Sequence, residues 1–164
     1  MAEADSYQTI KEKLEELLAT KGRNFYLEIT ATKGLSERLK KEIPQHREIV
    51  FAFLKKRPDL FGFGKGRYGS DLITVEVKDR IEKLDDIYQA KLYKEVFGAR
   101  YGFLITAEPI PEEIKRLCKN TFDILHSPAD SIHRFLAVGQ FDKEKREFVD
   151  WFEENPFEQD RYWR

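Results

Sequence analysis

Three charged residues, Asp59, Glu76 and Lys78, are spaced so that pairing two strands would gather them around a divalent cation. Asp59 begins the first of two apolar runs, and Glu76 and Lys78 end the second, which is rich in β-branched residues. Because side chains alternate along a strand, Glu76 and Lys78 lie on one face. Mg²⁺ binds carboxylate oxygens while it retains water and accepts substrate phosphate. These residue types favour metal-assisted hydrolysis of a phosphodiester.

A hairpin between the two runs determines which residues face one another. Strands near 58–63 and 72–78 place its centre between residues 67 and 68, so Asp59 falls opposite Glu76. Opposed side chains place their Cβ atoms about 5 Å apart, where two carboxylates repel unless positive charge lies between them. Lys78 supplies part of that charge and Mg²⁺ or Mn²⁺ the rest, with the backbone carbonyl of Val77 as a third oxygen ligand. Lys78 then positions the attacking water or the scissile phosphate.

Asp71 is a second candidate for the carboxylate that joins Glu76, because it is closer in sequence. It lies five residues before Glu76, so a regular strand puts it on the opposite face of the sheet. It also follows a Gly-Ser pair, where Asp commonly stabilises a turn. We therefore assign the metal to Asp59 and Glu76. The alternative for these residues and Lys78 is a surface cluster of charges across two strands.

The spacing of apolar residues predicts the elements that position these side chains. Helices are predicted for 6–20, 34–43, 45–56, 81–97 and 111–117. Ser6 is the predicted N-cap of the first helix. The fourth helix is predicted to begin with a capping box formed by Asp79 and Glu82 and to end at Gly98. Strands are predicted for 24–31, 58–63, 72–78, 100–107 and 121–126, and a hairpin of 134–141 with 147–152 follows. The strand–helix–strand unit over 72–107 implies two parallel neighbours. The fold class is therefore α/β, a mixed central sheet flanked by helices, with a β-rich C-terminal extension.

A single domain over residues 1–164, with its core near 24–107, fits the length and the 41% of apolar residues. No apolar run approaches the length of a membrane-spanning helix. The one cysteine, Cys118, excludes an intrachain disulfide and favours a reducing, cytoplasmic setting. The formal net charge is −1, but residues 33–67 carry a net charge of +6. A basic segment before the metal candidates suits a phosphate-backbone partner, although solvated helical faces explain it equally well.

The pattern Pro58-Asp59, sixteen residues, then Glu76-Val77-Lys78 resembles the PD-(D/E)xK signature of restriction-endonuclease-like nucleases. The following segment, IYQAKLYKEVFGARYGFLIT, is similar to the helix and strand of RecB-like exonucleases and Holliday-junction resolvases. Their Gln-x-x-x-Tyr element matches Gln89 and Tyr93, which share one helical face.

The resemblance covers residues 57–107 and implies a restriction-endonuclease-like fold with Mg²⁺- or Mn²⁺-dependent hydrolysis of DNA. It implies catalytic roles for Asp59, Glu76, Lys78 and Gln89, whose amide reaches the metal or a phosphate. It also implies a further acidic ligand on an earlier helix, for which Glu15, Glu16, Glu37 and Glu42 are all candidates.

Nucleic-acid contacts are expected from the basic stretch and from the tyrosine of the Gln-x-x-x-Tyr element. The expected residues are Lys40, Lys41, Lys55, Lys56, Arg57, Lys65, Arg67 and Tyr93. DNA and RNA both supply a phosphate backbone, and a homodimer is compatible with cutting two strands. The alternative function is a non-catalytic nucleic-acid-binding or assembly module that keeps the nuclease fold.

The segment 140–164 carries a net charge of −3 and is rich in aromatic residues. They are Trp151, Phe152, Phe157, Tyr162 and Trp163. Because the surrounding charge repels phosphate, these rings are expected to pack in the core or in a dimer rather than to stack on bases.

Overall fold

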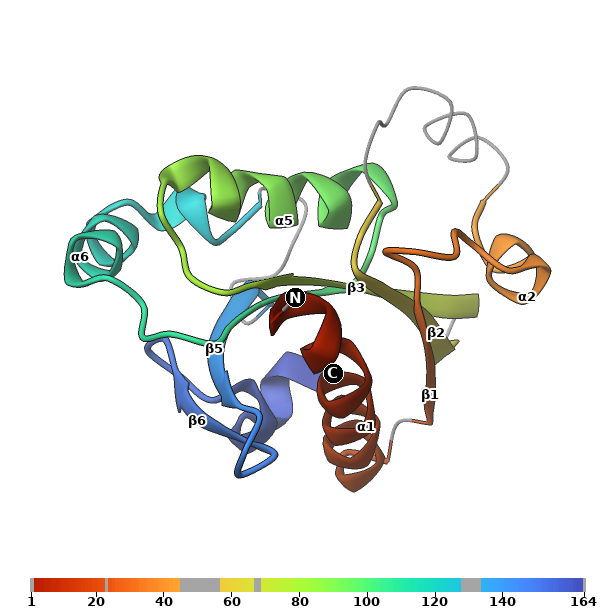
Figure 1. Ribbon diagram of the computed structural model, residues 1–164. Coiled ribbons are helices and arrows are strands. Elements are labelled where there is room, and N and C mark those ends of the chain that lie inside the picture. The colour runs from red at the N-terminus through yellow and green to blue at the C-terminus, as the bar shows by residue number, and fades with distance from the viewer. Residues whose placement is uncertain (1, 23, 45–56, 67–68, 128–133, 164) are drawn as a thin grey trace.

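A curved six-stranded sheet forms the centre of the protein, and helices cover both of its faces (Figure 1). The computed structural model describes residues 2–22, 24–44, 57–66, 69–127 and 134–163. The strands are β1 (Phe25–Ile29), β2 (Leu60–Gly66), β3 (Gly69–Lys78), β4 (Tyr101–Thr106), β5 (Leu136–Asp142) and β6 (Glu147–Trp151). Their order in the sheet follows the chain. The β3–β4 and β4–β5 pairs are parallel and the other three are antiparallel, which confirms a mixed α/β sheet.

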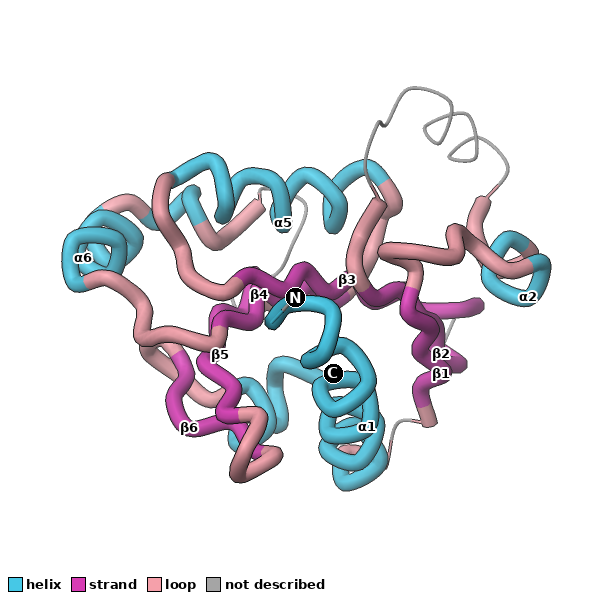
Figure 2. The backbone as a smooth tube through the Cα atoms, in the orientation of Figure 1, coloured by secondary structure: helices cyan, strands magenta, loops and turns pink. Residues whose placement is uncertain are grey.

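The helices divide between the two faces (Figure 2). The concave face holds α1 (Ala2–Thr20) and two 3₁₀ turns, η2 (Pro156–Glu158) and η3 (Asp160–Trp163). The other face is covered by α2 (Glu37–Lys40), α5 (Leu84–Val96) and α6 (Glu112–Asn120), the last followed by η1 (Phe122–Ile124). No helix in the described part of the chain has the length and apolar character needed to cross a membrane.

Strand β3 shows how the alternation of side chains separates the two cores. Ile73, Val75 and Val77 pack into the concave core with α1, where Leu14 of that helix is fully buried. Leu72, on the other face, packs against α5. Complete burial of one leucine stabilises the fold by about 2 kcal/mol. Glu76 has the same parity as Leu72 and therefore lies on the α5 face.

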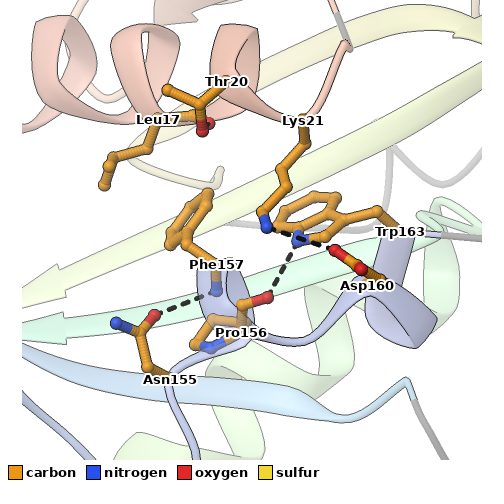
Figure 3. Close-up of polar contacts among 8 residues, drawn as sticks. All are labelled: Leu17, Thr20, Lys21, Asn155, Pro156, Phe157, Asp160 and Trp163. Atoms are coloured by element: carbon orange, nitrogen blue, oxygen red, sulfur yellow. Dashed lines mark hydrogen bonds and ion pairs between the residues drawn. The ribbon is translucent and has the colours of Figure 1, made fainter.

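Phe157, Tyr162 and Trp163 close the concave face beneath α1 (Figure 3), with Trp151 packed against them, whereas Phe152 packs in the core on the other face. The indole N–H of Trp163 donates a hydrogen bond to the Pro156 carbonyl oxygen at 2.8 Å. The side chain of Asn155 accepts the N–H of Phe157 at 2.9 Å, and Lys21 at the end of α1 lies 3.5 Å from Asp160. The expected packing of these rings in the core is confirmed. Strands β5 and β6 continue the central sheet and form its C-terminal extension.

Several predicted helix starts were wrong. The helix predicted for 34–43 is limited to Glu37–Lys40, with Ser36 as its N-cap. The first helix begins at Ala2, so Ser6 lies inside it, where its side chain is buried. The predicted helix 81–97 begins at Leu84, with Lys83 as its N-cap. The capping carboxylate is that of Asp86, which accepts the backbone N–H groups of Glu82 at 2.9 Å and of Lys83 at 3.2 Å. The prediction that Gly98 ends this helix is confirmed by its left-handed φ of 63°.

The strand predicted for 121–126 was also wrong, because residues Phe122–Ile124 form the 3₁₀ turn η1. Strand β4 is already paired with β3 on one side and β5 on the other, so this segment cannot pair with β4. The carbonyl oxygen of Leu125 instead accepts the N–H of Leu136 at the start of β5. The helix predicted for 45–56 lies outside the described residues.

Candidate active site

The segment Pro58-Asp59 is held at the start of β2 by the end of β1. The backbone N–H groups of Thr30 and Ala31 donate to the Asp59 carbonyl oxygen at 2.9 and 3.2 Å. The buried Thr30 hydroxyl donates to the Pro58 carbonyl oxygen at 2.6 Å. Leu60 pairs with Val75, so the same register places Asp59 opposite Glu76, as the predicted hairpin requires.

Both oxygens of the Asp59 carboxylate accept a hydrogen bond. Oδ2 accepts the backbone N–H of Val77 at 2.7 Å, and Oδ1 accepts the hydroxyl of Tyr7 at 3.1 Å. Tyr7 belongs to α1, on the concave side of the sheet. Its role was not predicted, because no pattern near Tyr7 links it to a residue 52 positions away. Val77, expected to offer its carbonyl oxygen, contributes its N–H to the site through Asp59.

Asp71, the other carboxylate of the hairpin, points away from this site. It pairs with Gly64 in the sheet and has the parity of Ile73, so it lies on the face opposite Glu76. Its carboxylate lies 3.7 Å from the guanidinium of Arg100. Asp71 is therefore a structural carboxylate and a useful control for substitutions at Asp59.

Glu76 is a buried carboxyl group, with only 4% of the residue exposed. Burial is the largest cause that raises its pKa to about 10, and hydrogen bonding with Asp59 and the Asp59 charge raise it further. The charge of Lys78 and a hydrogen bond with the Asp59 main chain act in the opposite direction. At neutral pH the Glu76 carboxyl group therefore keeps a proton beside the Asp59 carboxylate.

This carboxyl pair has the chemistry of a hard-cation site. Its side-chain donors are oxygens, which fit Mg²⁺ or Mn²⁺ that retain several water molecules. Throughout the described ranges, no group of three or more His, Cys, Asp or Glu side chains is arranged to hold one ion. Asp59 and Glu76 would be the two side-chain ligands, and a bound cation would replace the proton of Glu76.

Lys78 is the last residue of β3 and lies beside the carboxyl pair. The parallel register pairs it with Thr106 at the end of β4, and its carbonyl oxygen accepts the N–H of Ala107 at 3.2 Å. The side chain borders a cleft of about 610 Å³ at the carboxyl ends of these strands. The cleft is lined by Lys78, Asp79, Arg80, Glu82, Asp86, Ala107 and Glu108. This opening brings solvent and solutes to Lys78.

Helix α5 places Gln89 and Tyr93 on the same side of the sheet as Glu76. The Gln89 amide donates a hydrogen bond to the Tyr93 hydroxyl at 3.2 Å. Burial raises the pKa of Tyr93, the charges of Glu76 and Asp59 raise it further, and the hydrogen bond with Gln89 lowers it. Tyr93 is only 2% exposed and packs in the core beneath α5, so its ring is not on the surface where a nucleic-acid contact was expected.

The four candidate helical acids make contacts elsewhere. Glu15 and Glu16 pair with lysines of α1, Glu37 pairs with Lys40, and Glu42 accepts the Ser70 hydroxyl. The part of α1 that reaches the site is Tyr7, and Glu15 lies eight residues further on, about 12 Å along the helix axis. Ser70 pairs with Lys65 near the turn of the β2–β3 hairpin, so this contact lies at the far end of the hairpin from Glu76.

Several of the predicted nucleic-acid contacts are exposed basic side chains. Lys40, Lys41, Arg57 and Lys65 are exposed, whereas Lys55, Lys56 and Arg67 lie outside the described residues. Leu39 and Ile43 pack in the core with Tyr93, so α2 lies on the same face as the carboxyl pair. One arginine not predicted to take part, Arg38, stacks 3.7 Å above the ring of Tyr26.

Replacing Glu76 by glutamine should remove a pH-dependent loss of stability. Below its ordinary pKa of 4.5, Glu76 is protonated in both the folded and the unfolded protein. From there to its folded pKa of about 10, only the folded protein keeps the proton, so the free energy of unfolding falls as the pH rises. This loss is at most about 1.4 kcal/mol per pH unit. The free energy of unfolding of Glu76→Gln, relative to that of wild type, should therefore increase by about 1 kcal/mol for each unit by which the pH rises.

Urea unfolding of both proteins in EDTA, between about pH 6 and 8, measures this difference. A stability difference that stays constant over this range would mean that Glu76 titrates normally in the folded protein.

Comparisons of the chain with protein-family models, with curated proteins and with solved structures found no match. The fold and the site define an α/β protein with a mixed, open six-stranded sheet and a carboxyl pair, buried Glu76 and half-buried Asp59, at the ends of β2 and β3. Its function is therefore proposed from these residues.

Proposed function

We propose that this protein is a Mg²⁺-dependent nuclease of the PD-(D/E)xK type, with a restriction-endonuclease-like fold, that hydrolyses phosphodiester bonds in DNA. One observation carries the proposal. The hairpin register places Asp59 opposite a buried Glu76 whose pKa is raised to about 10, beside the ammonium of Lys78. Two carboxyl groups held together out of water at the end of a strand are costly unless a proton or a cation is shared between them.

Each residue of the site has a separate task in this proposal. Asp59 and Glu76 bind the cation, which when present lowers the pKa of a water molecule and stabilises charge that develops on the phosphate. Lys78 holds the attacking water or a phosphate oxygen as a point charge. Gln89, whose amide lies on the α5 side of the site, supports the water or phosphate through a hydrogen bond.

The distribution of charge supports an approach of the phosphate backbone from the α2 side. Lys40 and Lys41 are exposed at the end of α2, which packs on the face that carries the carboxyl pair. The acidic C-terminal segment instead closes the concave face. Binding of DNA by such lysines should weaken as the salt concentration rises.

The deciding experiment measures cleavage of labelled single-stranded, duplex and branched DNA in Mn²⁺, by wild type and by Asp59→Asn. The variant keeps the shape of the side chain but loses its charge, so the cleavage rate should fall at least about 100-fold. Asp71→Asn is the matched control, since that carboxylate lies on the other face of the same hairpin and pairs with Arg100.

Cleavage by wild type and Asp71→Asn, but not by Asp59→Asn, would support a nuclease and identify its substrate. Equal cleavage by all three proteins would mean that the activity does not depend on Asp59.

A binding or assembly module is the second candidate, and the same carboxyl pair favours it in one respect. A Glu76 carboxyl group that keeps its proton beside Asp59 is an arrangement that needs no cation. A folded wild type that binds DNA and cuts none of the three substrates would indicate this function.

A further inference from the structure

We infer that Tyr7 positions the Asp59 carboxylate for metal binding, a role that rests on the proposed function. The Tyr7 hydroxyl donates to Oδ1 of Asp59 at 3.1 Å, and the backbone N–H of Val77 donates to Oδ2 at 2.7 Å. The donors belong to two different elements, α1 and β3. With one donor on each oxygen, the plane of the carboxylate is fixed about the Cβ–Cγ bond.

The ring of Tyr7 holds this hydroxyl in place. Tyr7 is 8% exposed and belongs to the concave core, together with Ile10 and Leu14 of the same helix and Val77 of β3. Because the ring cannot turn away without opening that core, its hydroxyl remains directed at Asp59. Asp59 is thereby held by the side of the sheet opposite to the one on which Glu76 and α5 lie.

This arrangement prepares Asp59 to bind a cation. A hydrogen bond to an ionised carboxylate is among the stronger ones in proteins, and it leaves further lone pairs on Asp59 for the proton of Glu76 or for a cation that replaces it. Without the hydroxyl, Oδ1 loses its donor and the carboxylate gains rotational freedom. The cation then has to order the ligand as it binds, and this weakens binding while leaving the loaded site unchanged.

The test replaces Tyr7 by phenylalanine, which keeps the ring in the core and removes only the hydroxyl. Mn²⁺ binding in the absence of DNA is measured by titration calorimetry, and the Mg²⁺ concentration for half-maximal cleavage is measured separately. We expect the Mn²⁺ dissociation constant and the Mg²⁺ concentration for half-maximal cleavage each to rise about tenfold in Tyr7→Phe. The cleavage rate at saturating Mg²⁺ should stay within about twofold of wild type, because Tyr7 touches neither substrate nor cation.

Tyr26→Phe is the matched control. The Tyr26 hydroxyl also donates to a carboxylate, that of Glu28 at 2.7 Å. Among the hydrogen bonds of the described residues, none joins Tyr26 or Glu28 to Asp59. This variant should leave both metal values unchanged.

Unchanged Mn²⁺ affinity in Tyr7→Phe would overturn the role of Tyr7 and leave the proposed function standing. The role of Tyr7 would also be overturned if Tyr7→Phe cleaved slowly even at saturating Mg²⁺ and had a lower melting temperature than wild type. That combination would indicate structural damage. A wild-type protein that binds no Mn²⁺ would refute the proposed function, and the role of Tyr7 with it.

Discussion

Substitution of Lys78 by alanine should lower the rate of DNA cleavage by about 10³-fold and leave DNA affinity unchanged. Lys78 ends β3 beside the carboxyl pair and borders the cleft at the carboxyl ends of β3 and β4. Its ammonium is therefore placed to act on the reacting groups, whereas the expected affinity for the DNA backbone comes from exposed residues such as Lys40 and Lys41. Single-turnover cleavage rates and fluorescence anisotropy of labelled DNA separate the two effects.

The cleavage rates must be compared at saturating metal, because Lys78 also lowers the pKa of Glu76. Loss of its charge raises the pKa of Glu76 and also removes a repulsion of the bound cation, so metal affinity has to be measured together with cleavage. Lys78→Met keeps the apolar stem and should behave as Lys78→Ala does, while Lys119→Ala, at an exposed position of α6, should cleave normally. Equal cleavage by wild type and Lys78→Met would remove Lys78 from the mechanism.

Addition of Mg²⁺ or Mn²⁺ to the wild-type protein should raise its melting temperature. A ligand at about 100 times its dissociation constant stabilises the folded state by about 2.7 kcal/mol, which for a domain of this size is roughly 5–10 °C. The rise should disappear in Glu76→Gln, because the amide cannot replace an ionised ligand. It should be larger at higher pH, because the cation displaces the proton that burial and Asp59 hold on Glu76.

Asp71→Asn again serves as the control, and its melting temperature should rise with metal as the wild-type value does. The absence of any metal-dependent rise in wild type would favour the binding or assembly module. A rise that persists in Glu76→Gln would place the cation elsewhere in the protein.

The part of the site that depends on the hairpin could be predicted from sequence. Strands alternate strictly, so one assumption about the centre of the turn was sufficient to place Asp59 opposite Glu76 and Asp71 on the other face. The parallel pairing of β3 with β4 followed from the helix between them, and the buried run 101–106 identified a central strand.

The parts that sequence patterns missed depend on contacts between distant elements. Tyr7 reaches Asp59 because α1 crosses the concave face, and helical periodicity says nothing about where along the sheet a helix lies. The segment 121–126 has the composition of a strand, yet β3 and β5 occupy both positions beside β4. Helix α5 begins at Leu84 and not at Ile81, because Asp86 in its first turn caps the helix in place of the predicted pair, Asp79 and Glu82.

The closure of the concave face by residues 156–163 has a consequence for folding. Strand order follows chain order, so each strand pairs with its neighbour in the chain, and the β2–β3 and β5–β6 pairs are joined by short connections. Docking of α1 on η2 and η3 joins segments as far apart as Lys21 and Asp160, which are separated by 139 positions. A contact between segments this far apart carries a large loop-closure entropy cost, so we expect the concave core to be completed late in folding. Because Tyr7 lies in that core, we expect the geometry of Asp59 to be completed only when α1 has docked on the sheet.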